Sequence, residues 1–144
     1  MPCLTAETPA NASAHRWLMA SDLPLGSLPS AVACARGHVA AMCWEWRLAS
    51  LRDDATLIVS ELATNAVRAS SALDGRPPVW LRLLSDRADL LIEVWDMSPY
   101  APVIASPDSD ALSGRGLLLV AGIARQWGWH RAGNCKCVWA MLAT

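Results

Sequence analysis

The sequence predicts an α/β domain, a two-layer α+β sandwich in which a mixed, mostly antiparallel sheet carries helices on one face. Three observations predict this class. Two helix-length segments with apolar residues at helical spacing are followed by two segments in which apolar and polar residues alternate, and then by a short apolar helix with two more extended segments. The 144 residues, 53% of them hydrophobic, suffice to bury a core in one domain.

An amino-terminal segment of low apolar content precedes these elements. Residues 1–14 are rich in alanine, threonine and proline, so we expect a disordered segment there and the folded domain over 15–144. Within the domain, we expect residues 15–20 to form a short edge strand. The next stretch, 22–29, contains two prolines and a glycine and predicts a connector.

Two helices are predicted next. Pro29 suits the first turn of a helix, and apolar residues then recur at helical spacing as far as Trp46. The second helix begins at Ser50-Leu-Arg-Asp53, the pattern of an N-terminal capping box, and runs to about Ser70. Its apolar arc consists of Leu51, Ala55, Ile58, Leu62 and Ala66.

The second half of the chain predicts a hairpin, a long loop, a helix and two strands. Apolar residues alternate over 79–84 and 89–96, which predicts the hairpin. Residues 97–113 contain three prolines and little apolar pattern, and a loop of this length inside a domain is usually functional or disordered. A third helix is expected from Leu117 to about Gln126. Extended segments around 127–130 and 136–142 follow, joined by a turn at Gly133-Asn134.

Charge and composition argue against several classes of protein. The net charge is −1 and no basic cluster is present, which argues against direct binding of nucleic acid. No apolar run approaches the ~20 residues of a membrane span, and the amino terminus lacks the pattern of a secretory signal. An odd number of cysteines, five, without a signal predicts reduced thiols and a cytoplasmic protein. Cys135 and Cys137 share a face of an extended segment, where we expect them to pack and not to bind zinc.

Glu61 and Asn65 are the first candidate functional pair. At positions i and i+4 of the second helix they share one face, and Asn65 falls within the apolar arc, where a polar amide needs a partner. One interpretation is a magnesium ligand beside a carboxylate that orients a water or a hydroxyl. The other is an asparagine at the edge of the core bonded to backbone, and the short pattern alone favours this second interpretation.

Two further candidates lie around the long loop. Asp96 ends the second strand of the hairpin, where its carboxylate could accept a hydrogen bond from an amino group such as that of adenine, or could simply be a turn residue. Ser113-Gly-Arg-Gly116 precedes an apolar helix, whose N-terminus offers free amides and a positive dipole end to phosphate. The alternative for this segment is a tight turn with a solvated Arg115.

The order of these segments resembles the GHKL superfamily of ATPases, which includes gyrase, heat-shock chaperones, histidine kinases and MutL and has the Bergerat fold. The chain is more closely similar to the short anti-sigma-factor serine/threonine kinases of bacteria and their actinobacterial relatives. The resemblance covers about residues 15–142. Its matching segments are 59–67, 93–99 with Pro102, 114–120, 125–128 and 136–139.

The resemblance implies ATP and Mg²⁺ as cofactors and assigns roles by position. Asn65 matches the magnesium ligand, Glu61 the catalytic base and Asp96 the adenine-binding aspartate. Residues 97–113 match the ATP lid. Further nucleotide-binding positions are matched by Ser98, where the wider superfamily has glycine, by Gly114, Arg115, Gly116 and Leu117, and by Cys137, where a threonine commonly helps to recognise adenine.

These roles imply an ATP-dependent regulatory protein that phosphorylates serine or threonine of an antagonist (anti-anti-sigma) partner and sequesters a sigma factor. Phosphoryl transfer needs mainly positioning, magnesium and charge stabilisation, which such a site supplies. A non-catalytic ATP-dependent scaffold is the alternative, because ligands for a nucleotide do not by themselves imply turnover. A purely structural interaction domain is the third interpretation, which nucleotide binding would remove. The sequence leaves open whether the chain forms a homodimer.

Overall fold

A computed structural model describes residues 17–102 and 115–144, without the side chain of Arg115. The predicted amino-terminal segment 1–14 and most of the predicted lid therefore lie outside the described residues. In chain order the elements are β1 (Met19–Gly26), α2 (Ser30–Glu45), the 3₁₀ turn η2 (Ala49–Leu51), α3 (Arg52–Ser71), β2 (Val79–Ser85), β3 (Asp89–Asp96), α4 (Arg115–Ile123), β4 (Gln126–Ala132) and β5 (Cys135–Ala143).

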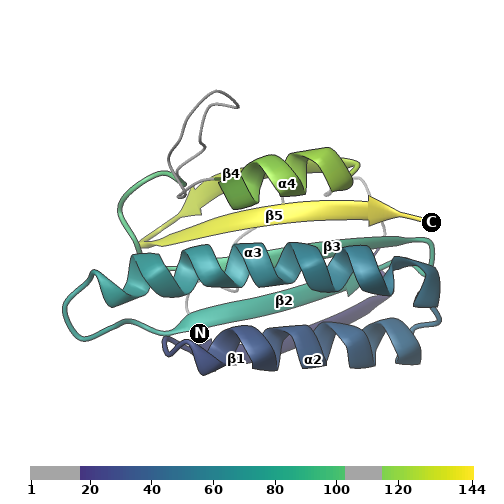
Figure 1. Cartoon of the computed structure of the whole chain (residues 1–144), viewed down its shortest axis with the longest axis horizontal. Coiled ribbons are helices and arrows are strands. Elements are labelled where there is room, and N and C mark those ends of the chain that lie inside the picture. Colours follow the sequence, from purple (N-terminus) through teal and green to yellow (C-terminus); the bar gives the residue numbers. More distant parts are fainter. Residues whose placement is uncertain (1–16, 103–114) are drawn as a thin grey trace.

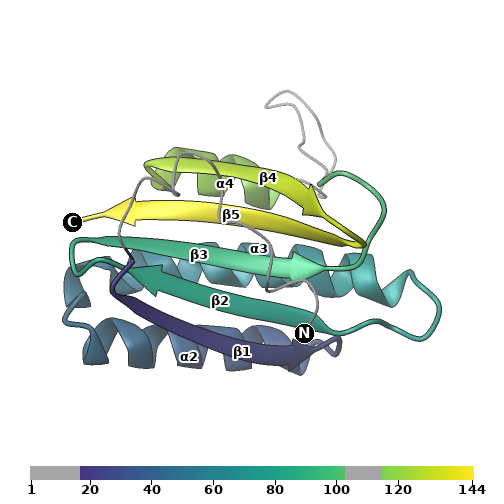
Figure 2. The ribbon, with the colours of Figure 1, turned by 180° about the vertical axis from the view of Figure 1, so that it is seen from behind.

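The described strands form one sheet in the order β1-β2-β3-β5-β4, and each neighbouring pair is antiparallel. Helices α2, α3 and α4 lie side by side on one face of this sheet, which Figure 1 shows from the helical side and Figure 2 from the opposite side. The predicted α/β class, with helices on one face of the sheet, is confirmed. The antiparallel pairing of all four strand pairs replaces the mixed sheet of the prediction.

The first strand is longer than the sequence suggested. Residues 22–26, predicted as part of a connector, belong to β1 and pair with β2. Leu23 and Leu25 pack against the core, and half-buried and exposed positions alternate along the whole strand. Pro24 is tolerated because β1 is an edge strand, where a missing N–H breaks no ladder on the outer side.

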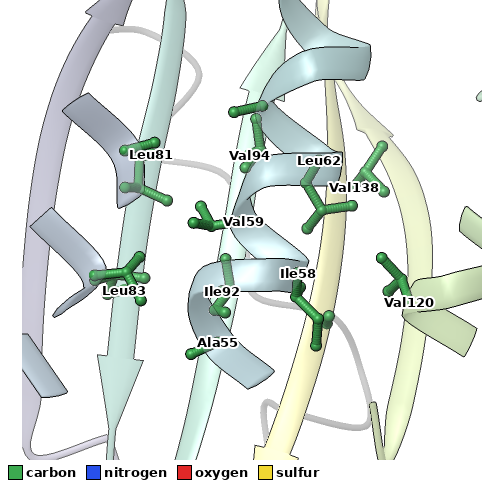
Figure 3. Packing of buried hydrophobic residues seen from close by; sticks show 14 of the residues in the cluster. Ala55, Ile58, Val59, Leu62, Leu81, Leu83, Ile92, Val94, Val120 and Val138 are labelled. Carbon is green, nitrogen blue, oxygen red and sulfur yellow. The ribbon is translucent and has the colours of Figure 1, made fainter. Parts of the chain in front are cut away.

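Helix α3 is the centre of the domain and packs on β2, β3, β5 and α4. Figure 3 shows its apolar side chains inserted between those of the sheet, with Ile58 and Leu62 directed toward Val120 and Val138. Burying each such side chain contributes roughly 1.5–3 kcal/mol. Because this packing fixes the rotation of α3, it also fixes the direction in which Glu61 and Asn65 point.

The opposite face of the sheet carries a second buried cluster, made by Leu84, Leu91, Trp95, Cys135, Cys137, Trp139 and Met141. Among the described cysteines, Cys34, Cys43 and Cys137 are free thiols, but Cys135 is disulfide-bonded. The prediction that the thiols are reduced is therefore wrong for Cys135. None of the helices within 17–102 and 115–144 has the length and apolar content that crossing a membrane requires.

Candidate functional site

A cavity of about 310 Å³ lies between the second half of α3 and the sheet. This is the lower end of the volume range of small-molecule sites, which are mostly apolar with a few placed polar groups. Its walls come from α3, from the ends of β3 and β5, from the residues after β3 and from α4. They are formed by Leu62, Asn65, Ala66, Arg68, Ala69, Ala72, Leu73, Val94, Asp96, Ser98, Tyr100, Ala101, Pro102, Leu117, Lys136 and Val138.

Asp96 and Lys136 form a buried ion pair in the wall of the cavity. They are register partners on β3 and β5, and Lys136 Nζ lies 3.5 Å from Asp96 Oδ2. The Asp96 side chain is only 3% exposed, and the Lys136 side chain is only 5% exposed. Burial raises the pKa of the Asp96 carboxyl above its ordinary value, whereas the Lys136 ammonium and the Ser98 backbone N–H oppose that rise. The site therefore holds an acceptor and a donor side by side in an apolar wall.

The segment after β3 is fastened to the sheet by these and neighbouring groups. The Ser98 backbone N–H donates to Asp96 Oδ1 at 2.8 Å, and Lys136 Nζ donates to the Tyr100 carbonyl at 2.9 Å. Arg131 of β4 donates to the carbonyls of Ser98, at 3.2 Å, and of Pro99. The first residues of the predicted lid, 97–100, are thus anchored by side chains of β4 and β5. Ala101 and Pro102 line the cavity, and lid residues 103–113 lie outside the described residues.

Glu61 and Gly116 meet where α3 passes the first turn of α4. A Cβ atom placed on Gly116 would overlap the Glu61 carboxylate and would lie 3.2 Å from its Cδ carbon. Only glycine permits this approach. A carboxylate at the N-terminus of a helix is favoured by the free N–H groups and the positive end of the helix dipole. Glu61 does not line the cavity, and its carboxylate makes no hydrogen bond within the described part of the chain.

Asn65 and Leu117 do line the cavity. Asn65 lies one turn beyond Glu61 on α3, and its amide has no hydrogen-bond partner among residues 17–102 and 115–144. Arg68, which the sequence argument overlooked, is exposed at the cavity wall and forms no ion pair with a described residue. The cavity wall therefore presents the Asn65 amide and the Arg68 guanidinium, and the Glu61 carboxylate lies beside the first turn of α4.

The structure does not bring Cys137 to the cavity. It belongs to the cluster on the far face of the sheet, where its thiol lies 3.8 Å from Glu93 Oε2. Successive residues of a strand point to opposite faces, so the residue beside Asp96 is Lys136 and not its neighbour. We correct the predicted nucleotide site accordingly. Gly114 lies outside the described residues, and Arg115 is placed only as the first residue of α4.

Lys136 could have been found from the sequence. It is the only lysine of the chain. Lys136, Val138 and Ala140 occupy every second position and so share one face of the strand, and Val138 and Ala140 belong to the core under the helices. The alternation assigns Lys136 to the helical face of the sheet once β5 is recognised as a strand. Arg68 gives no such signal, since a basic residue in the last turn of a helix is ordinary.

Residues 25–142 match the family described as the histidine kinase-like ATPase domain. The match includes each of the cavity-lining residues and both Glu61 and Gly116. No curated protein sequence matches the chain. Because the family match covers most of the chain and agrees with the antiparallel sheet under three helices, the chain belongs to the histidine kinase-like ATPase domain family.

Proposed function

We propose that the chain is an intracellular ATP-binding regulator that uses Mg-ATP to phosphorylate serine or threonine of an antagonist partner and thereby controls a sigma factor. One observation carries the proposal. An apolar cavity with a buried Asp96–Lys136 pair at one end continues to Asn65, next to the contact of Glu61 with the first turn of α4. Membership of an ATPase-domain family supports ATP as the ligand.

The residues present fit the parts of ATP. A purine is a flat apolar ring with polar edges, and the cavity offers Leu62, Val94 and Val138 to its faces and the Asp96 carboxylate to its amino group. Phosphates suit the N-terminus of α4, whose first N–H groups have no partner within the helix.

The oxygen of the Asn65 amide would hold magnesium. The described residues contain no cluster of three histidine, cysteine or acidic side chains. Magnesium in phosphoryl-transfer sites is usually held by one or two protein oxygens together with substrate phosphates and water, which agrees with a single amide ligand here. The ion neutralises charge on the phosphates when it is bound.

Glu61 would act as the general base. Transfer to a serine or threonine hydroxyl forms a new O–P bond to the γ-phosphorus, releases ADP and leaves one hydroxyl proton to be taken up. The Glu61 carboxylate, one turn from Asn65 on the same helix face, is the acceptor for that proton.

A non-catalytic scaffold is the second candidate, and the position of Glu61 favours it. Its carboxylate rests against Gly116 and does not line the cavity. In that arrangement Glu61 serves as a charge partner of the α4 N-terminus, and ATP would set the affinity for a partner without being consumed.

Paired variants on α3 separate these functions. We expect Asn65→Ala to abolish magnesium-dependent ATP binding, whereas Glu61→Ala should keep ATP binding and lose transfer, because a ligand acts in the ground state and a base mainly in the transition state. Thr64, whose hydroxyl donates to the Ser60 carbonyl at 2.6 Å, supplies the control variant Thr64→Ser on the same turn.

The measurements are calorimetric titration with Mg-ATP and transfer of label from γ-labelled ATP to proteins of a host extract. Wild type and Thr64→Ser should bind ATP and transfer label. ATP binding without transfer in wild type, or normal transfer by Glu61→Ala, would reject the kinase assignment. The absence of ATP binding in wild type would reject both candidate functions.

A further inference from the structure

Lys136 is a buried charged residue of the cavity wall to which the proposed reaction gives no role. Only 5% of its side-chain surface is exposed. A buried ammonium is costly unless it is paired and hydrogen-bonded. Lys136 meets this requirement through Asp96 Oδ2 at 3.5 Å and through the Tyr100 carbonyl at 2.9 Å.

An ammonium has three N–H donors, and these contacts use two. Lys136 itself lines the cavity, as do its register partner Asp96 and Val138 on the same strand. The remaining donor is therefore available to a ligand next to the Asp96 carboxylate. The site presents an acceptor and a donor along one edge of whatever ring occupies the cavity.

The edge of adenine has the complementary pattern. Its exocyclic amino group is a donor, and the adjacent ring nitrogen, N1, is an acceptor. In the same pose guanine presents a carbonyl to the carboxylate and an N–H to the ammonium, so both contacts are mismatched. An arrangement of this kind discriminates more strongly than one carboxylate, because the wrong base places an acceptor against Asp96 and a donor against Lys136 and so forms neither hydrogen bond.

We propose that Lys136 is a specificity-determining residue that donates a hydrogen bond to N1 of adenine beside the amino group bound by Asp96. This inference rests on the proposed ATP site and adds a second point of base recognition to it. Arg68 does not replace Lys136 in this role, since it is exposed and is not paired with Asp96.

The test compares ATP with 1-deaza-ATP, in which a C–H group replaces N1 and the amino group is kept. Wild type should bind 1-deaza-ATP roughly ten-fold or more weakly than ATP, since a hydrogen bond to a charged donor is lost. Lys136→Met keeps a side chain of similar length without the ammonium. We expect it to bind the two nucleotides with equal affinity.

A merely structural role for Lys136 gives a different result. In that case Lys136→Met weakens both nucleotides alike and the ratio of their dissociation constants stays at the wild-type value, which would overturn the inference. The double variant Asp96→Asn/Lys136→Met removes both charges together and keeps the test valid if the single variant folds poorly; its ratio should also be one.

Cys137→Ser is the matched control, because Cys137 is the neighbouring residue on β5 but faces away from the cavity. It should keep the wild-type ratio. Equal binding of ATP and 1-deaza-ATP by wild type would contradict the role of Lys136 and leave the ATP site standing. Failure of wild type to bind either nucleotide would contradict the ATP site itself.

Discussion

Two buried carboxylates of β3, Asp96 and Glu93, lie on opposite faces of the sheet and differ in how they are compensated. Asp96 accepts a backbone N–H at 2.8 Å and pairs with Lys136 in the cavity wall. Glu93 lies 3.7 Å from Arg82 Nε through its Oε1 atom, which accepts no hydrogen bond from a described residue. The first arrangement is suited to an ionised acceptor, and the second favours a protonated acid.

Glu93 makes the stability of the fold depend on pH. Burial raises the pKa of the Glu93 carboxyl from 4.5 to about 7, with the nearby Asp22 acting in the same direction and Arg82 opposing both. Because the folded-state pKa is the higher one, the stabilising contribution is full below pH 4.5 and is lost as the pH rises to about 7.

We therefore expect Glu93→Gln, which cannot ionise, to gain stability over wild type as the pH rises from 5 to 8. The measurement is the midpoint of urea unfolding of both proteins at each pH. A difference between the two midpoints that stays constant over this range would show that Glu93 has an ordinary pKa.

At the scale of single residues, the sequence identified four of the residues that form the wall. Asn65, Asp96, Ser98 and Leu117 were predicted and do line the cavity. Cys137 was misplaced by one residue, and a shift of one residue along a strand exchanges the two faces. Alternation in the sequence indicates which residues of β5 share a face, but the position of Lys136 directly beside Asp96 follows from the register of β3 with β5 in the folded protein.

Among the elements, the close approach of Glu61 on α3 to the first turn of α4 depends on Gly116. Gly116→Ala would push the Glu61 carboxylate away from the α4 N-terminus, although the end of a flexible side chain can move at little cost in stability. We expect stability close to wild type, since alanine is favoured over glycine in helices by about 1 kcal/mol. Label transfer should fall by about 10²-fold, because the substitution displaces the proposed general base.

Gly122 provides the matched control on the same helix, because a Cβ atom there meets nothing within 4 Å. Gly122→Ala should stabilise the protein and leave transfer unchanged. Stability is measured by thermal unfolding and transfer with γ-labelled ATP. If Gly116→Ala and Gly122→Ala behave alike in both assays, the close approach of Glu61 to α4 has no functional role.

The boundaries of the helices and strands could be predicted from the sequence only in part. Periodicity placed α2 and the hairpin nearly where they lie, but proline and glycine in 22–29 suggested a connector where β1 continues to Gly26. The edge position, which tolerates Pro24, is a property of the sheet and not of the strand. The expected capping box at Ser50 is also absent: Ser50 lies in η2, and α3 begins without a side-chain cap.

For the whole molecule, the order of motifs carried more information than any single motif. The second helix with Glu61 and Asn65, the strand ending in Asp96 and the helix beginning near Gly116 are separated in sequence, yet they surround one cavity. Their convergence follows from the antiparallel order of the sheet, which places β5 beside β3 and α4 beside α3.

The measurement that tests the account most directly is calorimetric titration of wild type and Asp96→Asn with ATP and GTP in the presence of magnesium. We predict that wild type binds ATP more tightly than GTP. Asp96→Asn should weaken ATP binding by about 1.5–3 kcal/mol, the value of a hydrogen bond to a charged group. Equal affinity of wild type for ATP and GTP, unchanged in Asp96→Asn, would contradict the assignment of this cavity as an adenine nucleotide site.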